Sequence, residues 1–282
     1  MPELPEVETV RRGLAPVMEG RVIETAVANR PDLRFPLPDR FTERLKGARI
    51  ERFSRRAKFL VAELSSGEAL IMHLGMTGRF TITGKGQPGD FHHQIAPDTK
   101  HDHVIFNMEG GHVVTYNDPR RFGFMELWPL SELAAYPRLS GYGPEPQSNE
   151  FSHAWLNDAL ASKSGPIKSA LLDQRVIAGL GNIYVCEALY RSGISPRRRA
   201  STVPGARAAR LAVAINDVIR EAIAAGGSSI SDFKAASGEL GYFQHTFAVY
   251  DRENQPCKNC GAPIRRIVQS GRSSFYCGNC QR

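Results

Sequence analysis

The spacing of apolar residues divides this chain into a short helix, a run of strands and a second helical region. Residues 5–18 have one apolar face with the spacing of a helix, formed by Val7, Val10, Leu14 and Val17. Between residues 21 and 128 the pattern changes to short alternating runs separated by glycine turns. We expect seven strands there, at residues 22–28, 48–53, 59–64, 69–74, 103–108, 112–116 and 124–128. Because no helix interrupts this run, it predicts a β-sandwich with a flanking helix.

Helical spacing returns after residues 137–148, whose Gly and Pro content indicates a linker. The clearest apolar stripe spans residues 208–223 and ends at a Gly-Gly pair. An earlier helix is expected to begin at Gly165 and to end at the turn 179–182, which leads into a further helix through Arg191. Two helices joined by a glycine turn suit a nucleic-acid backbone, since helix N-terminal amides can hold a phosphate. An ordinary helical hairpin has the same pattern.

Four of the five cysteines form two CxxC pairs, Cys257, Cys260, Cys277 and Cys280. Each CxxC turn presents two sulfurs to one metal, so the spacing predicts one structural zinc ion. Two disulfides are the alternative, which a reducing compartment disfavours. Residues 264–268 and 273–276 predict a hairpin between the pairs, giving a ribbon with too few apolar residues to fold without metal. The fifth cysteine, Cys186, lies in an apolar helix and is expected to be a core thiol.

The distribution of charged residues along the chain indicates what kind of partner the protein binds. The chain has 36 Lys and Arg against 29 Asp and Glu, a formal net charge of +7. The excess is clustered in residues 52–58, in residues 197–199 and in residues 257–282, where five basic residues occur without an acidic one. Separate basic patches fit a polyanion partner. No run approaches the ~20 apolar residues of a membrane span and no secretory leader is evident, so we expect a soluble, intracellular protein without a membrane partner.

The first residues, Met1-Pro2-Glu3, carry the candidate chemistry. Removal of Met1 leaves the secondary amine of Pro2 at the N-terminus. An α-amino group titrates near pH ~8, so more of it is unprotonated near neutrality than of a lysine, and it attacks electrophilic carbon to form an iminium. Glu3 lies beside it as an acid or base. The competing interpretation is a common Met-Pro start that leads into a helix.

Six motifs in a fixed order then indicate a family. They are MPELPEVET at residues 1–9, HLGMTG at 73–78, KHDH at 100–103, NDPRRFG at 117–123, GLGNIY at 179–184 and the final zinc ribbon. In this order they resemble the bacterial formamidopyrimidine-DNA glycosylases, and the match extends from residue 2 to residue 281. The long loop after Gly84 is the one large unmatched segment, and residues 84–100 read as a surface loop.

The resemblance implies a base excision repair enzyme, a DNA glycosylase that is also an abasic-site lyase. It implies that Pro2 attacks the sugar C1′ of an oxidised purine nucleotide, such as 8-oxoguanine or a formamidopyrimidine, and that Glu3 protonates the opening sugar ring. Lys58 resembles the lysine assigned to β-elimination, and Arg272 the arginine that assists δ-elimination. The expected product is a strand cleaved by β,δ-elimination, with zinc as a structural ion and no metal needed for catalysis.

The resemblance also implies the contacts with DNA. Enzymes of this type evert the damaged nucleotide, which leaves a gap in the duplex. Met76, Arg120 and Phe122 resemble the residues that fill the gap, although Met76 and Phe122 could instead belong to a core. Four further residues resemble contacts on the phosphate side: His101, Lys163, Lys168 and Asn182. The expected partner is double-stranded DNA containing oxidised purines or abasic sites, and the expected protein is a monomer in the bacterial cytoplasm, associated with the nucleoid.

The implied fold is α+β in four parts. They are an N-terminal catalytic β-sandwich at residues 1–136, a helix-two-turn-helix domain at 149–227, a lesion-recognition loop region at 228–246 and a zinc finger at 247–282. The lesion range and the base preferred opposite the lesion do not follow from the sequence, because such recognition loops vary.

Three alternatives stay open from the residues alone. One is a DNA-binding protein without activity, against which the intact Pro2, Glu3 and Lys58 count. Another is a zinc-ribbon RNA-binding protein, which the lack of an aromatic stacking signature weakens. The third concerns a second metal site formed by the histidines of residues 92–103, which lack nearby cysteines.

Overall fold

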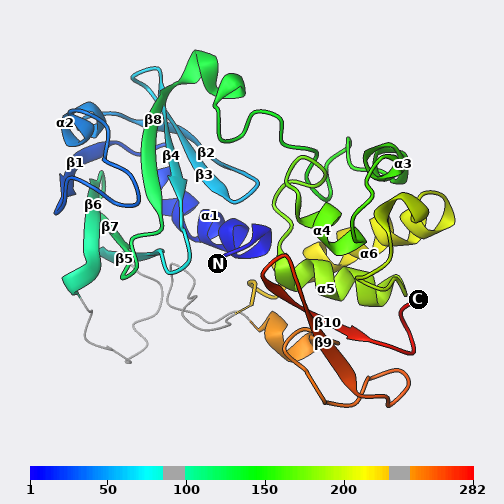
Figure 1. Cartoon of the computed structure of the whole chain (residues 1–282). Helices are drawn as coiled ribbons and strands as arrows, with labels where there is room; N and C mark the ends of the chain where they lie inside the picture. Colours follow the sequence, from blue (N-terminus) through cyan, green and yellow to red (C-terminus); the bar gives the residue numbers. More distant parts are fainter. Residues whose placement is uncertain (85–98, 229–241) are drawn as a thin grey trace. The chain divides into compact units, whose positions relative to one another are not determined.

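The computed structural model describes residues 1–84, 99–228 and 242–282, which form two compact units (Figure 1). Among these residues the first unit comprises 1–84, 99–140 and Ser228, and the second comprises 141–227 and 242–282. In the described part of the chain, no helix combines the length and the apolar character needed to cross a membrane.

The first unit contains eight strands in two antiparallel sheets of four. One sheet has the order β1-β6-β7-β5, with β1 at Ile23–Ala28, β6 at Asp102–Met108, β7 at His112–Asn117 and β5 at Arg79–Gly84. The other has the order β2-β3-β4-β8, with β2 at Ile50–Arg56, β3 at Phe59–Leu64, β4 at Glu68–His73 and β8 at Phe124–Pro129. Short turns connect three of the neighbouring pairs, β2-β3, β3-β4 and β6-β7, whereas the other three pairs bring together strands that are far apart in sequence.

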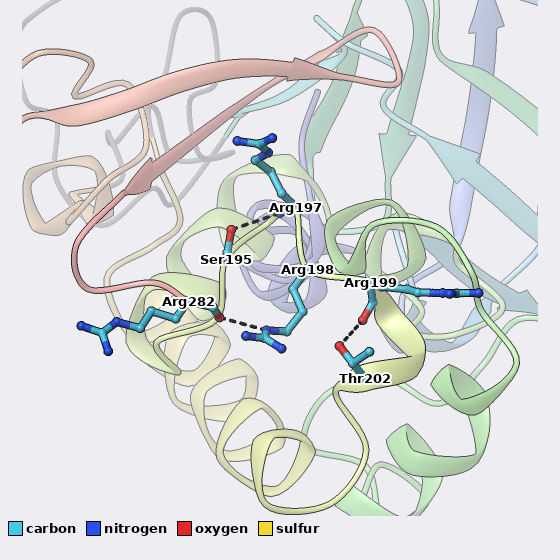
Figure 2. Close-up of a pocket in the computed structure, with 6 residues that line it drawn as sticks. All are labelled: Ser195, Arg197, Arg198, Arg199, Thr202 and Arg282. Atoms are coloured by element: carbon cyan, nitrogen blue, oxygen red, sulfur yellow. Dashed lines mark hydrogen bonds between the residues drawn. The ribbon is translucent and has the colours of Figure 1, made fainter.

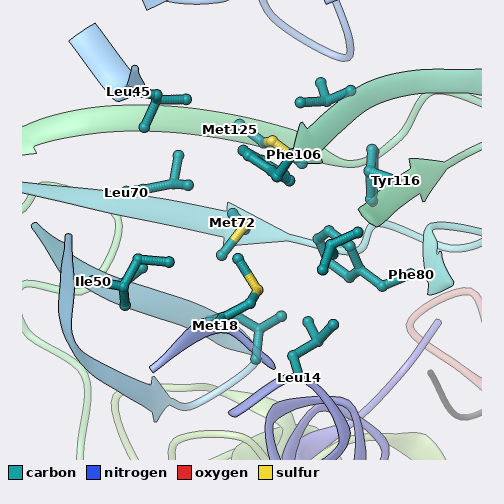
Figure 3. Close-up of a cluster of buried hydrophobic side chains, with 14 of the residues drawn as sticks. Leu14, Met18, Leu45, Ile50, Leu70, Met72, Phe80, Phe106, Tyr116 and Met125 are labelled. Atoms are coloured by element: carbon teal, nitrogen blue, oxygen red, sulfur yellow. The ribbon is translucent and has the colours of Figure 1, made fainter. Parts of the chain in front are cut away.

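A single apolar cluster joins the two sheets and the first helix, α1 (Leu4–Met18). Leu14 and Met18 of α1 lie in the same cluster as Met72 of β4 and Phe106 of β6 (Figure 3). All four side chains are at most 1% exposed. Two sheets that share one interior form a sandwich, so the predicted β-sandwich with a flanking helix is confirmed.

One strand and one α-helix of this unit were not expected from the sequence. Strand β5 pairs with β7 over its whole length, and Phe80 packs its ring against Tyr116 at 5.1 Å between centroids. The short helix α2 (Phe41–Leu45) buries its first and last residues. Both elements are five or six residues long and polar on one side, so their structure depends on the core that they cover.

The second unit is helical, with α3 at His153–Ala161, α4 at Ile167–Leu172, α5 at Asn182–Arg191 and α6 at Ala206–Ala224. Helix α6 contains the predicted apolar stripe, and α5 begins and ends as predicted. Helix α4 is shorter than expected, because Asp173 ends it and turns follow until residue 181. The carbonyl oxygen of Val176 in this segment accepts a hydrogen bond from the Trp155 indole at 2.8 Å instead of continuing a helix.

The chain ends in an antiparallel hairpin of β9 (Ile264–Gln269) and β10 (Arg272–Cys277). Its two-residue turn, Ser270-Gly271, has positive φ at both positions (48° and 74°), the geometry that matches the twist of the strands. Buried residues of this ribbon pack with Cys186 of α5, which is 1% exposed. The predictions of a ribbon hairpin and of a core thiol at Cys186 are both confirmed.

Candidate active site and nucleic-acid interface

The four cysteines of the ribbon converge on one point. Their sulfur atoms all lie within 4.8 Å of one another, with Cys260 and Cys277 at 3.5 Å and Cys257 and Cys280 at 3.9 Å. Four thiolates around zinc at ~2.3 Å each lie about 3.8 Å apart in a tetrahedron. These residues therefore fit one zinc ion, and all five cysteines of the chain are free of disulfides. The hydroxyl of Tyr190, 3.3 Å from the sulfur of Cys257, supports the site from α5.

The candidate catalytic residues divide between the two units, and the first unit holds the N-terminus. Pro2 and Glu3 are buried immediately before α1. The backbone N–H of Glu3 donates to the Glu6 carboxylate at 2.9 Å, which gives this helix start a fixed geometry. The other oxygen of Glu6 accepts from the N–H and the hydroxyl of Ser228, at 2.8 and 3.0 Å. Glu6 thus connects the N-terminus with the residue that begins the expected recognition loop.

The surroundings of the terminal amine favour its uncharged form. Burial lowers the pKa of the amino group, which belongs to Met1 in the chain as written. Glu3 and Glu6 act against this shift, whereas the positive charges of Lys58 and Arg120 lower the pKa further. The structure therefore brings the amine, Glu3, Lys58 and Arg120 into one electrostatic environment. An amine with a lowered pKa is a better nucleophile near neutrality.

A tight turn determines where Lys58 lies. Arg56 pairs with Phe59 across β2 and β3, so Ala57 and Lys58 form the two-residue connection. Ala57 has φ of 52°, a left-handed conformation that is unfavourable for a residue with a Cβ. Arg55 stabilises this turn by donating to the Ala57 carbonyl at 2.8 Å. The side chain of Lys58 is only 7% exposed, which is unusual for lysine.

His73 belongs to this environment as well, although the sequence pattern indicates no role for it. Burial, followed by the charges of Lys58, Arg34 and Arg138, lowers its pKa to about 4. The ring is therefore neutral at pH 7, and its Nδ1 accepts from the N–H of Gly75 at 3.0 Å. The hydrogen must then be on Nε2, which can donate to an anion. The sequence feature that could have identified His73 as a site residue is its position at the start of the HLGMTG motif.

The three candidate gap-filling residues lie in two exposed loops. Met76 is 43% and Phe122 is 41% exposed, and the Arg120 guanidinium lies over the Phe122 ring at 4.8 Å. The loops touch at Gly75, where an added Cβ would lie 2.3 Å from the backbone of Phe122. Neither Met76 nor Phe122 is a core residue, so the alternative raised from the sequence is wrong.

Asp118 holds both loops in place. Its buried carboxylate accepts from the hydroxyls of Thr77 and Tyr116 and, at 2.8 Å, from the N–H of Gly123. One acidic side chain thus joins the segment that carries Met76 to the segment that carries Phe122. The sequence motif contained Asp118 but gave no indication of this role.

His101 lies half-buried in a short 3₁₀ turn, and its carbonyl accepts from the N–H of Asp118 at 3.1 Å. The carboxylate of the next residue, Asp102, accepts from the side-chain amide of Asn117 at 2.8 Å. His92 and His93, considered for a second metal, lie outside the described residues. Among the residues that are described, the cysteine cluster is the one group of three or more suitable ligands.

The second unit holds Lys163, Lys168, Asn182 and Arg272. Lys163 is half-exposed and pairs with Asp173 at 3.2 Å. The N–H2 group of Asn182, at the start of α5, donates to the carbonyl of Ser273 at 3.0 Å. Arg272 is exposed at the tip of the finger hairpin, directly beside Ser273.

Lys168 has a different environment from the one that its resemblance to a phosphate contact implies. Its side chain is 0% exposed. The ammonium donates at 2.7 Å to the Ser273 carbonyl and at 2.7 Å to the Ser274 hydroxyl. Lys168 and Asn182 therefore both bind the hairpin strand that begins with Arg272.

Comparison with known proteins gives matches along the whole chain. Three family models match in order: the formamidopyrimidine-DNA glycosylase N-terminal domain at residues 1–125, its H2TH domain at 142–234, and a zinc finger found in FPG and IleRS at 254–282. The formamidopyrimidine-DNA glycosylase of Azorhizobium caulinodans is 57% identical over 293 residues and covers 100% of both chains.

Solved structures of formamidopyrimidine-DNA glycosylases are also similar to this chain along its whole length. A Lactococcus lactis FPG variant bound to DNA containing Fapy-dG is 33% identical, with a TM-score of 0.87. The L. lactis Fpg bound to abasic-site DNA is 33% identical with a TM-score of 0.86, as is a MutM bound to DNA containing carbocyclic 8-oxo-G. Each comparison covers 100% of both chains. The chain therefore belongs to the formamidopyrimidine-DNA glycosylase family.

Proposed function

We propose that this protein removes oxidised purines, 8-oxoguanine and formamidopyrimidines, from duplex DNA and then cleaves the abasic site by β,δ-elimination. Family membership and the DNA bound by its relatives, which contains Fapy-dG, 8-oxo-G or an abasic site, support the substrate class. The observation that carries the chemistry is the start of the chain: Pro2 and Glu3 are buried there, and burial together with the positive charge of Lys58 lowers the pKa of the terminal amine.

Base removal begins with Pro2 once Met1 has been cleaved. The uncharged proline nitrogen attacks C1′ of the everted nucleotide, and the bond from C1′ to the base breaks. The base leaves with that electron pair and takes up a proton, which balances the N–H proton that the proline nitrogen loses after the attack. Glu3 donates a proton to O4′ as the sugar ring opens, which leaves a cationic iminium that joins Pro2 to C1′.

Strand cleavage follows from the iminium. Its positive charge acidifies the C2′ protons, and Lys58 assists the loss of one of them. The released electron pair forms the bond between C2′ and C3′ while the 3′ phosphate departs. Loss of a C4′ proton then expels the 5′ phosphate, whose negative charge Arg272 stabilises. Water adds to C1′ of the remaining iminium, which releases the sugar fragment as an aldehyde and frees Pro2.

The other residues hold the DNA. Met76, Arg120 and Phe122 occupy the gap left by the everted nucleotide, because unstacking costs a few kcal/mol that inserted side chains must offset. His101, Lys163 and Asn182 contact the phosphate backbone. For Lys168 the buried ammonium supports a positioning role: it holds the strand that presents Arg272 and does not touch DNA.

The parts of the chain then have separate tasks. Residues 1–136 carry out base removal, residues 149–227 bind the backbone, and residues 247–282 dock DNA through a finger that one zinc ion stabilises. Residues 228–246 recognise the lesion, although 229–241 of that segment lie outside the described residues. The protein acts as a monomer on chromosomal DNA in the bacterial cytoplasm.

Blocking the N-terminus tests the central step. A chain that retains residues ahead of Pro2 has an amide nitrogen there and cannot form an iminium. We expect it to bind abasic DNA with little loss but to give no adduct on borohydride reduction, which traps an iminium covalently. The control is the processed protein on the same DNA. Undiminished trapping by the extended chain would rule out Pro2 as the nucleophile.

A further inference from the structure

The proposed function leaves one basic cluster without a role, the run Arg197-Arg198-Arg199 between α5 and α6. These residues line an open hollow of about 530 Å³ together with Ser195, Thr202 and Arg282 (Figure 2). Four of the six lining residues are arginines and none has a carboxylate side chain. A surface with this charge favours an anionic ligand.

The hydrogen bonds of each arginine show which guanidinium groups are available to a ligand. The Nε of Arg198 donates to the backbone oxygen of Arg282 at 2.9 Å, so Arg198 is part of the local structure. Arg197 and Arg199 are exposed, and within the described residues their guanidinium groups make no hydrogen bond or ion pair. Two other arginines of this unit are paired with acids instead: Arg175 with Asp173 and Arg191 with Glu221.

Backbone hydrogen bonds place this segment beside the proposed phosphate contacts of the same unit. Ser201 donates to the carbonyl of Lys163 at 3.0 Å, and Ile167 donates to the carbonyl of Arg198 at 2.7 Å. On the other side, the Gln269 side chain of β9 donates to the carbonyl of Pro196 at 3.1 Å. The arginine segment therefore lies between the Lys163 loop and the hairpin that presents Arg272.

The directions of the side chains indicate the kind of anion. In Figure 2 the side chains of Arg197, Arg199 and Arg282 extend in different directions and do not converge on one point. Such an arrangement suits several anionic groups in a row better than one small anion. A duplex backbone supplies such a row, with one charge every ~3.4 Å along each strand.

We infer that Arg197 and Arg199 contact backbone phosphates of the duplex outside the lesion, so that they extend the footprint of Lys163 and the finger hairpin. This inference rests on the proposed function for the identity of the partner. The contacts are independent of sequence and of damage, since phosphates carry no base information. They would hold the protein on undamaged DNA during the search for a lesion.

The test compares the double variant Arg197→Ala/Arg199→Ala with the control Arg207→Ala/Arg210→Ala. The control removes the same charge from exposed arginines at the start of α6. Binding to an undamaged duplex of about three helical turns is measured by fluorescence anisotropy over a range of salt concentrations. We expect the slope of log K against log salt to decrease by about 1.8 in the double variant and little in the control. The ratio of the wild-type binding constant to that of the double variant then falls about tenfold as the salt concentration rises from 50 to 200 mM.

A second duplex of about one helical turn around an abasic site tests the position of the contacts. On this short duplex the wild type and the double variant should bind with equal affinity, because the duplex does not reach the proposed contacts. An unchanged salt slope on the long duplex, or an equal advantage on both lengths, would overturn the inference. A third result would also overturn it: inorganic phosphate stabilises the wild type against unfolding but not the double variant, while both proteins bind DNA equally well. That result would indicate a site for a small anion. Borohydride trapping of the wild type tests the proposed function separately, because it reports on the iminium and not on flanking phosphates.

Discussion

Individual side chains in this protein are positioned by neighbours that the motifs alone did not single out. Glu6 binds both the Glu3 backbone and Ser228, and Asp118 joins the loops of Met76 and Phe122. Both carboxylates are nearly or fully buried and hydrogen-bonded to several donors. A buried acid in such a network costs stability when one donor is lost, so these residues fix geometry as well as charge.

His73 gives the clearest pH dependence at this scale. Its pKa is lowered from 6.5 to about 4 in the folded protein. As the pH falls through 6.5 the unfolded chain takes up a proton here, but the folded protein does so only near pH 4. The free energy of unfolding should therefore decrease across this window, by up to about 3 kcal/mol from this residue.

The variant His73→Asn keeps an acceptor for the N–H of Gly75 but does not titrate. We expect its free energy of unfolding, measured by urea denaturation, to depend less on pH between 6.5 and 4 than that of the wild type. A lower stability at all pH values is also expected, because the ring stacks on Phe124 at 5.2 Å. Parallel pH profiles for the two proteins would contradict the assignment.

At the scale of elements, the sequence predicts what depends on local pattern and fails where tertiary contacts decide. The long stripe of α6 and the CxxC hairpin follow from spacing alone. Helix α4 ends at Leu172, and Asp173 directly after it pairs with Lys163 and Arg175. The residues are close in sequence, but apolar periodicity does not reveal ion pairs of this kind. The burial of Lys168 does not follow from the sequence either, because lysines are mostly exposed and nothing in its surroundings along the chain marks an exception.

Lys168 should act through the hairpin that it supports. In Lys168→Met the ammonium bonds to Ser273 and Ser274 are lost, and we expect a cost of about 1–2 kcal/mol in unfolding free energy. The second elimination should slow more than borohydride trapping, since only the former uses Arg272. In an Arg272→Ala background, where the phosphate contact of the hairpin is already absent, Lys168→Met should leave the salt slope of DNA binding unchanged. Lys163→Met is the matched control and should lower that slope by about 1, as expected for a phosphate contact. A lowered salt slope on adding Lys168→Met to the Arg272→Ala background would instead mean that Lys168 itself contacts a DNA phosphate.

The zinc ribbon should fail as one element when its metal is lost. Cys257→Ala removes one of the four ligands, and we expect the purified variant to contain no zinc and to bind DNA more weakly. Residues 1–136 should stay folded, which limited proteolysis followed by mass measurement would show. Cys186→Ala is the control, because it removes a thiol outside the cluster and should keep one zinc per chain. A full zinc content in Cys257→Ala would exclude the four-cysteine site.

At the scale of the whole molecule, the residues proposed for one reaction are divided between two units. Pro2, Glu3 and Lys58 belong to the first unit, and Arg272 belongs to the second. Base removal and the first elimination need the iminium and a base, whereas the second elimination also needs a cation at the 5′ phosphate. The steps should therefore be separable by mutation.

We expect the wild type to leave a one-nucleotide gap with phosphate at both ends, without added magnesium. Arg272→Ala should still be trapped by borohydride through Pro2, but it should accumulate the β-elimination product and bind DNA less tightly. Arg265→Ala, which removes an exposed arginine from the same hairpin, is the control and should give the wild-type product. Denaturing gels of a labelled oligonucleotide distinguish the products by their ends. If the wild type leaves only an intact abasic strand, it is a glycosylase without lyase activity, and the iminium chemistry proposed for Pro2 does not cleave the backbone.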